Sequence, residues 1–283
     1  MHRMCRMKLT QANYYSREAN EAYMSASQYK AFARCEAAAM AELRGEWSRG
    51  STQALLVGGY LDAYFSGEME QYRAEHPEIF KRDGTLKAEY IQAQAAAYRL
   101  ERDELCRMLL SGRHQIIKTG KIGGVWFKGK FDSLLTSSQV EAIVRRYPAV
   151  RDMVPLGGPM IIDLKYMRDF EQVWDPEQGE KVSFVTYWGY DIQGAIYQAL
   201  DGRQAPFGIV GVTKDAEPDL GAFAVSDGDM EAALLDVEQN APRYAAIKRG
   251  EITPHRCGRC PYCRATKRID HFTDHRLAGL VAE

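Results

Sequence analysis

The sequence predicts an α/β fold: a central mixed β-sheet flanked by helices, with an N-terminal helical region and a cysteine-rich C-terminal tail. Two changes of pattern along the chain lead to this prediction. Residues 25–110 repeat apolar positions at helical spacing, whereas short apolar runs typical of strands begin after His114. A helical segment at 184–200 then separates two such runs, and strands joined through a crossover helix indicate a sheet covered by helices.

The helices are expected from their caps and their apolar faces. Ser25 stands three residues before Gln28, which is the spacing of a capping box, and Tyr29 and Phe32 follow on one helical face. The expected helices span 25–44, 52–65, 88–110, 184–200 and 229–248.

The strands are expected where β-branched and aromatic residues alternate between turns, at 115–118, 125–132, 161–166 and 207–213. The polar insert at 137–159 is predicted to contain turns and a short helix. The charged segment at 168–181 is predicted to be a mobile loop near the functional face of the sheet.

Composition and charge exclude several classes of protein. The 283 residues are 46% hydrophobic and carry a formal net charge of −1, so nucleic acid could be bound through a local patch but not by bulk charge. No segment stays apolar for the roughly 18 residues of a membrane helix. The basic N-terminus lacks the apolar core of a secretory signal. We expect a cytoplasmic protein with an extension at 1–24, a main domain at 25–250 and a basic tail at 251–283.

Asp163 and Lys165 end an apolar run and are the first candidate site residues. Residues two apart on a strand point to the same face, so this carboxylate and this ammonium would project together. Asp132, at the end of an earlier predicted strand, adds a second carboxylate. Mg²⁺ commonly takes one or two carboxylates together with waters and phosphate oxygens, so the set suits metal-assisted phosphodiester hydrolysis. A surface ion pair is the other interpretation.

Three further residues are candidates with an ordinary structural alternative. Asp62 lies in an apolar predicted helix and either faces solvent or joins the same metal as Asp132 and Asp163. Gln193 and Tyr197 are four residues apart and share a helix face. They either belong to the site or are a surface glutamine and a core tyrosine.

Three of the six cysteines, Cys257, Cys260 and Cys263, lie within seven residues of one another. In a large chain of this kind such crowding indicates metal binding rather than disulfides. A fourth ligand has to come from elsewhere, and His255 is a candidate if the metal is zinc. Cys35 on a predicted helix is either a ligand or a small core residue.

The order of the motifs resembles the PD-(D/E)xK nuclease superfamily, in particular the phage and prophage RecE-like (exonuclease VIII-like) enzymes of its RecB-like branch. The similarity spans residues 25–265 and is carried by four motifs in order: Gly58-x-x-x-Asp62, Gly-Lys-Phe-Asp132, Ile-Ile-Asp163-Leu-Lys165 and Gln193-x-x-x-Tyr197. The resemblance implies a restriction-endonuclease-like core. It also implies a Mg²⁺- or Mn²⁺-dependent exonuclease that hydrolyses linear duplex DNA in phage or prophage recombination.

Residue by residue, the resemblance implies a catalytic set of Asp132, Asp163, Lys165, Gln193 and Tyr197. The two aspartates and the carbonyl of Leu164 would hold the metal, and the lysine would orient the attacking water or offset charge on the phosphate. The Gln-x-x-x-Tyr pair would position the DNA. The branch usually has histidine where this chain has Asp62, and a carboxylate at that position can also hold Mg²⁺.

The cysteines carry a second resemblance. Some RecB-like nucleases, AddB among them, have one cysteine before the nuclease motifs and three near the C-terminus, which together hold a 4Fe-4S cluster that joins the chain ends. Cys35, Cys257, Cys260 and Cys263 have this layout, with a shorter last spacing. The resemblance therefore implies a 4Fe-4S cluster and a tail that packs back on the first helix. Zn²⁺ is the alternative, since it accepts four thiolates.

The basic C-terminal run and the resemblance both bear on the partners of the chain. The run from Arg243 to Arg268 has eight Lys or Arg and one acidic residue, Glu251, so it is either a DNA-contacting patch or a solvated face. RecE-like enzymes form closed oligomers and work with a single-strand annealing protein, so the resemblance implies both for this chain. The alternatives to an enzyme are a catalytically inactive nuclease-fold module that binds DNA or protein, and a structural protein with a zinc-binding tail.

Overall fold

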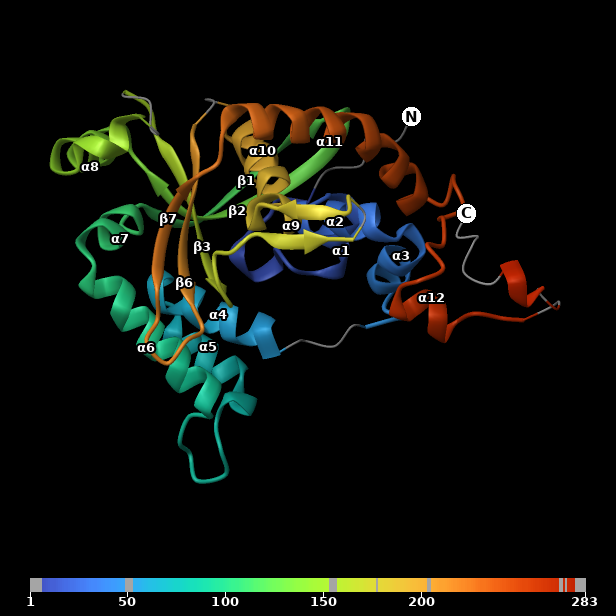
Figure 1. The fold of residues 1–283 in the computed structure, drawn as a ribbon, viewed down its shortest axis with the longest axis horizontal. Helices are drawn as coiled ribbons and strands as arrows, with labels where there is room; N and C mark the ends of the chain where they lie inside the picture. Colours follow the sequence, from blue (N-terminus) through green and yellow to red (C-terminus); the bar gives the residue numbers. More distant parts are fainter. Residues whose placement is uncertain are drawn as a thin grey trace. The chain divides into compact units, whose positions relative to one another are not determined.

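The computed structural model describes residues 7–48, 53–152, 157–176, 178–202, 205–269, 272 and 274–277. The predictions for residues 1–6, 52, 153–156, 177 and 278–283 lie outside the described residues. The chain forms two compact units, drawn together in Figure 1. We call residues 51–120 and 129–235 the sheet unit, and residues 1–50, 121–128 and 236–283 the cysteine unit.

A mixed five-stranded sheet has the strand order β1-β2-β3-β6-β7. Its strands are β1 (Arg113–Ile122), β2 (Val125–Leu135), β3 (Met160–Met167), β6 (Phe207–Thr213) and β7 (Leu220–Ala224). β3 runs parallel to β6, while β2–β3 and β6–β7 are antiparallel. A parallel pair needs a crossover connection, and the helix α10 (Tyr190–Asp201) supplies it between β3 and β6. The predicted fold class is therefore confirmed.

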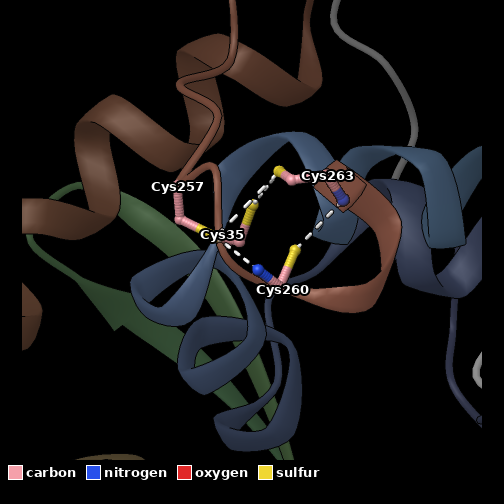
Figure 2. Close-up of side chains that lie close together, drawn as sticks. All are labelled: Cys35, Cys257, Cys260 and Cys263. Atoms are coloured by element: carbon pink, nitrogen blue, oxygen red, sulfur yellow. Dashed lines mark hydrogen bonds between the residues drawn. The ribbon is translucent and has the colours of Figure 1, made fainter. Parts of the chain in front are cut away.

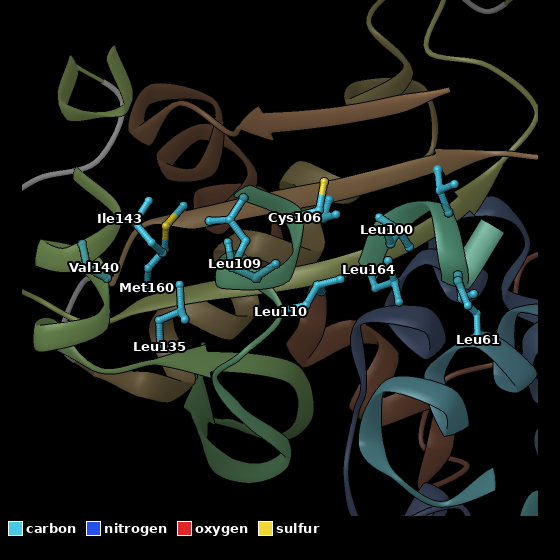
Figure 3. Packing of buried hydrophobic residues seen from close by; sticks show 14 of the residues in the cluster. Leu61, Leu100, Cys106, Leu109, Leu110, Leu135, Val140, Ile143, Met160 and Leu164 are labelled. Atoms are coloured by element: carbon cyan, nitrogen blue, oxygen red, sulfur yellow. The ribbon is translucent and has the colours of Figure 1, made fainter. Parts of the chain in front are cut away.

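One face of the sheet carries the main apolar core of the sheet unit, part of which is shown in Figure 3. Alternate residues of β3, Met160, Ile162 and Leu164, point into this core. It is covered by α4 (Gln53–Ser66), α6 (Ala88–Arg102), α7 (Glu104–Leu109) and α8 (Ser137–Arg146). The intervening residues of β3, which include Asp163 and Lys165, consequently point to the other face.

α10 packs on that other face. A Cβ at Gly194 would come within 2.6 Å of the Phe207 ring on β6, so only glycine permits this approach of helix and strand. Phe207 is paired in register with Ile161, which lies on the same side of β3 as Asp163. The tight packing at Gly194 therefore brings α10 against the strand face that carries the candidate site.

Three predicted helices are interrupted. The helix expected at 25–44 is α2 (Ala26–Arg34) and α3 (Glu36–Arg44), because Cys35 has extended backbone angles of φ −167° and ψ 107°. The helix expected at 88–110 ends at Asp103, whose side chain accepts a hydrogen bond from the N–H of Cys106 and caps α7. The helix expected at 184–200 is α9 (Phe184–Tyr187) followed by α10, with Gly189 at φ 63° between them.

The segment predicted as a loop at 168–181 contains a hairpin instead. β4 (Val173–Asp175) pairs with β5 (Glu180–Val182), and Trp174 lies opposite Lys181. Valine occupies one end of each strand, and Gly179 takes the positive φ of 71° that the turn requires.

The cysteine unit is mostly helical. Tyr29 and Phe32 of α2 pack on Tyr244 of α11 (Asp227–Lys248), with ring centroids 5.4 Å apart in both pairs. Of the other described helices, α1 (Arg17–Ala22), α12 (Pro261–Ala265) and the 3₁₀ turns Gln11–Asn13 and His275–Leu277 belong to this unit. The helix α5 (Met69–Glu75) and the 3₁₀ turns Pro77–Ile79 and Pro148–Asp152 belong to the sheet unit. None of the described helices is long and apolar enough to cross a membrane.

Candidate active site and cysteine centre

Asp163 is an almost fully buried carboxylate, 2% exposed, on β3. Its Oδ1 accepts a hydrogen bond of 2.6 Å from the amide Nε2 of Gln193 on α10. Its buried Oδ2 forms an ion pair with the ammonium of Lys165 but accepts no regular hydrogen bond. The pair is compatible with burial because the lysine offsets the charge of the aspartate. The lysine side chain is 21% exposed, so it also reaches solvent.

The strands β2 and β3 separate next to Asp163. Their register pairs Ser133 with Ile162, and the pairing ends there. Beyond this point the backbone N–H of Leu164 donates to Oδ2 of Asp132 at 3.0 Å, so a side chain takes the place of a strand partner. This hydrogen bond holds Asp132 beside the Asp163 segment of β3.

The electrostatics link three aspartates. Burial, with the charges of Asp163 and Asp62, raises the pKa of Asp132 well above its usual range. Burial also raises the pKa of Asp62 to about 6, although Lys165 and Lys130 oppose the shift. Burial alone would lower the pKa of Lys165, but the charges of Asp163 and Asp132 raise it. Burial and the repulsion of neighbouring carboxylates thus both favour the protonated forms of Asp62 and Asp132.

The carboxylate oxygens of the three aspartates are not all within the distance at which one ion could bind them together. Among the described residues, the four cysteines form a set whose ligand atoms all lie within 4.8 Å of one another, and the three aspartates do not. The ion pair with Lys165 holds one oxygen of Asp163 in this arrangement. Binding of one ion by all three carboxylates would require them to move inward.

α10 brings three polar side chains to this region. Besides Gln193, the hydroxyl of Tyr197 donates to the carbonyl of Lys130 at 3.1 Å. The ring centroid of Tyr190 lies 5.1 Å from Nζ of Lys165, at the distance of a cation–π contact.

Sequence reasoning missed Tyr190, although it stands three residues before Gln193 and so on the same helix face. It also missed Lys130, two residues before Asp132, as a charge that acts on Asp62.

The four predicted cysteines come together in the cysteine unit (Figure 2). Cys35, at the break between α2 and α3, has its Sγ 3.6 Å from that of Cys263 on α12. The Sγ atoms of Cys257 and Cys263 are 4.0 Å apart, and Cys260 completes the set. His255, the spare ligand candidate, is outside this set.

Contacts between protein groups hold the cysteine-bearing segments in place. Both carboxylate oxygens of Glu36 accept from Arg243, at 2.7 and 2.9 Å. One of them also accepts from the backbone N–H of His255 at 2.7 Å. The N–H of Ala37 donates to the His255 carbonyl at 3.0 Å. The start of α3 is thereby fixed to the chain just before Cys257.

Backbone N–H groups also point at the sulfurs. The N–H of Cys260 lies 3.4 Å from Sγ of Cys257, and the N–H of Cys263 lies 3.4 Å from Sγ of Cys260. Burial would raise the pKa of Cys257, but the N–H groups of Arg259 and Cys260 outweigh it and lower this pKa to about 7. The thiolate, which is the form that binds metals, is therefore accessible at neutral pH for Cys257.

A protein-family model described as a PDDEXK-like domain of unknown function (DUF3799) matches residues 25–142 and 150–266. The chain belongs to this family. Its fold is also similar to a crystal structure of a "putative exonuclease" from Eubacterium rectale, with a TM-score of 0.82 at 38% sequence identity. That match covers 96% of this chain and 98% of the other, so the two proteins are similar over nearly their whole lengths. The predicted PDDEXK-like character is confirmed.

Proposed function

We propose that this protein is a metal-dependent deoxyribonuclease that hydrolyses linear duplex DNA from its ends, as RecB-like, RecE-like exonucleases do. The observation that carries the proposal is the Asp163–Lys165 pair on β3, with Asp132 anchored beside it, in a chain of a PDDEXK-like family. The similarity to the Eubacterium rectale protein supports attack at DNA ends. On the RecE-like resemblance we further propose a role in phage or prophage recombination in the bacterial cytoplasm, with a single-strand annealing protein as partner.

The donor set fits a hard divalent cation. Carboxylates of Asp132, Asp163 and Asp62 and the carbonyl of Leu164 are oxygen ligands of the kind that Mg²⁺ and Mn²⁺ prefer. Burial is the main cause of the raised pKa values of Asp62 and Asp132, and a cation bound beside these carboxylates would favour their charged forms. When bound, the ion would polarise the scissile phosphate and lower the pKa of an attacking water.

The protein groups then have separate tasks. Cation binding at Asp163 would release Lys165, whose partly exposed ammonium would orient the water or offset charge on the phosphate oxygens. Gln193 would keep the Asp163 carboxylate in one orientation through its hydrogen bond. Tyr197 would hold β2 through the carbonyl of Lys130, two residues before Asp132. We therefore assign Gln193 and Tyr197 positioning roles.

We also propose that the four cysteines hold one metal centre. Their Sγ atoms lie within 4.8 Å of one another. Four thiolates about 2.3 Å from one tetrahedral Zn²⁺ would be about 3.8 Å apart, close to the separations of 3.6 and 4.0 Å. In a 4Fe-4S cluster each thiolate binds a different iron, which requires wider separations. The sulfur positions thus favour Zn²⁺, whereas the resemblance to AddB implies the cluster, and metal analysis distinguishes them.

The test of the activity compares DNA forms. With Mg²⁺ or Mn²⁺ the protein should degrade linear duplex DNA, leave covalently closed circles intact, and be inactive in chelator. The variant Asp163→Asn, prepared in the same way, is the control for contaminating nucleases. Intact linear duplex and single strands after incubation with metal-replete protein would favour the inactive binding module.

A further inference from the structure

The basic run at the end of the chain divides into two parts with different surroundings. In the first part, Arg243 binds Glu36 and Arg249 binds Glu251. Lys248 is held by the carbonyls of Asn20 and Tyr23, at 2.7 and 2.9 Å. Each of these three side chains therefore has a partner within the cysteine unit.

The second part surrounds a cavity. A space of about 510 Å³ is lined by Arg256, Gly258, Cys263, Thr266, Lys267 and Arg268. Three of these residues, Arg256, Lys267 and Arg268, are cations. Within the part of the chain that the structure describes, the salt bridges of the cysteine unit involve other cations and none of these three. The described residues of the lining therefore present three positive side chains and no acidic one.

One wall of the cavity is fixed by its own contacts. Nη2 of Arg256 donates to the carbonyl of Cys263 at 3.2 Å and to the hydroxyl of Thr266 at 2.6 Å. Its guanidinium carbon lies 5.2 Å from the ring centroid of Tyr262. These bonds use one nitrogen of the guanidinium, which has five N–H donors in all. Arg256 is thus held in place with donors still available to a ligand.

We propose that this cavity binds phosphate groups of a nucleic-acid backbone. Guanidinium groups bind phosphate oxygens in a bidentate manner, and a neighbouring lysine adds a point charge. The Thr266 hydroxyl is already used, since it donates to the carbonyl of Tyr262 at 2.7 Å and accepts from Arg256. The lining therefore offers its cations, which contact phosphates without reading base sequence. With a net charge of −1, the chain has to contact DNA through local groups rather than through bulk charge, and this cavity is one such group of cations. The inference rests on the proposed function only in naming DNA as the ligand, and it uses no residue of the Asp163 site.

Salt dependence of binding provides the test. Binding of a fluorescent linear duplex is measured by anisotropy between 50 and 200 mM salt, the range in which phosphate contacts dominate. All proteins carry Asp163→Asn, so that DNA is not cut during the measurement. Because each phosphate contact contributes a slope of about 0.9, Lys267→Ala/Arg268→Ala should reduce the slope of log K against log salt by about two. With the affinity at about 1 M salt unchanged, this slope change lowers the affinity at about 0.1 M salt roughly 60-fold.

The matched control removes two adjacent exposed cations of the sheet unit, Lys81→Ala/Arg82→Ala, and should change neither the slope nor the affinity. Zinc and iron content is measured for every variant, so that loss of the cysteine centre is not mistaken for loss of a phosphate contact. Inorganic phosphate is titrated separately as the free anion.

Equal slopes for the two double variants would overturn the proposal, as would the absence of salt-dependent DNA binding by the Asp163→Asn protein. Binding of inorganic phosphate with an unchanged DNA slope would show a free-anion site and would also overturn it. Failure of the proposed exonuclease activity is seen separately, in the digestion of linear duplex by the unmodified chain.

Discussion

Lys165 and a divalent cation would compete for the same oxygen of Asp163. In the structure the ammonium forms an ion pair with Oδ2, and Gln193 binds Oδ1. A cation that binds Oδ2 has to displace the ammonium, which then becomes available to water or phosphate. On the proposed function, this contact would keep the buried carboxylate paired before metal binding and would free the lysine afterwards.

The first prediction separates these two residues. Asp163→Ala should abolish cutting and greatly weaken Mn²⁺ binding, because a ligand is lost. Lys165→Ala should also abolish cutting but leave Mn²⁺ affinity equal or higher, because the competing ammonium is gone. Isothermal titration calorimetry with Mn²⁺ and digestion of linear duplex measure the two properties on the same preparations. Equal loss of Mn²⁺ affinity in both variants would contradict the assignment.

The second prediction concerns the dependence of stability on pH. An ordinary Asp has a pKa of about 3.9, whereas that of Asp62 in the folded chain is about 6. Since the folded state holds this proton more tightly, the contribution to stability is present at low pH and is lost as the pH rises from about 4 through about 6. Without divalent cations, deprotonation of Asp62 should therefore lower the melting temperature of the unmodified chain as the pH rises through that interval. The Asp62→Asn protein should not show this decrease.

Calorimetry in cation-free buffer at pH 4.5 and pH 7 measures that difference. Adding Mg²⁺ at pH 7 should restore stability to the unmodified chain more than to Asp62→Asn, if Asp62 is a ligand. The same response to Mg²⁺ in both proteins would remove Asp62 from the metal site.

Among the elements, α10 has the most direct influence on the site, because it carries Gln193 and Tyr197 and is seated by Gly194. The third prediction is that Gly194→Ala lowers stability by about 1–3 kcal/mol, because its Cβ would meet the Phe207 ring at 2.6 Å. The helix can relieve this contact only by moving away from β6, which displaces Gln193. Turnover of linear duplex should therefore fall together with the melting temperature.

Gly58→Ala on α4 is the matched control, since nothing lies within 4 Å of a Cβ at that position. It should stabilise the chain slightly, as alanine is about 1 kcal/mol better than glycine inside a helix. If Gly194→Ala lost stability without any loss of turnover, the seating of α10 would not control the site.

The helix breaks show what local sequence can and cannot predict. Asp103 caps α7, and Gly189 at positive φ starts α10, so both breaks had a local signal. The break at Cys35 had none, because the helical apolar pattern continues through it. Its extended backbone coincides with the tie between Glu36 and Arg243, which are 207 residues apart. Contacts over that separation are not visible in a local pattern.

The candidate site was predictable to the extent that it follows from periodicity. The alternation of a strand places Asp163 with Lys165, and the helix period places Gln193 with Tyr197 and would have placed Tyr190 as well. The bond between Asp132 and the N–H of Leu164 was not predictable, because it depends on where the β2–β3 pairing ends. Register and strand separation are set by tertiary packing rather than by either segment alone.

At the scale of the whole molecule, a metal centre at the four cysteines would close a loop as long as any that the described contacts reveal, equal to the one between Asn20 and Lys248. Cys35 and Cys263 are 228 residues apart in sequence, and their sulfurs lie 3.6 Å apart. A cross-link over a loop of this length restricts the unfolded chain, an effect on the order of 5 kcal/mol in the chain-entropy estimate for disulfides. A metal bound by groups that the unfolded chain does not hold together acts in the same direction.

The last prediction is therefore that Cys260→Ala lowers the melting temperature and the solubility while the cutting rate per folded molecule stays the same. Cys260 is part of the four-sulfur set in the cysteine unit, whereas Asp163 and Lys165 lie in the sheet unit. Cys106→Ala is the matched control, because Cys106 is buried in the apolar core and belongs to no such set. The Cys106→Ala protein should lose stability through lost packing but keep its bound metal, whereas the Cys260→Ala protein should lose the metal.

Metal analysis of protein prepared without oxygen or chelator identifies the centre. Zinc at about one ion per chain in colourless protein would match the sulfur separations, and brown protein containing iron would establish the cluster instead. In either case Cys260→Ala should lose more stability than Cys106→Ala, because removing one of four ligands weakens the cross-link as well as the local packing. If the chain held neither metal and the two variants lost the same stability, the four thiols would be ordinary reduced cysteines.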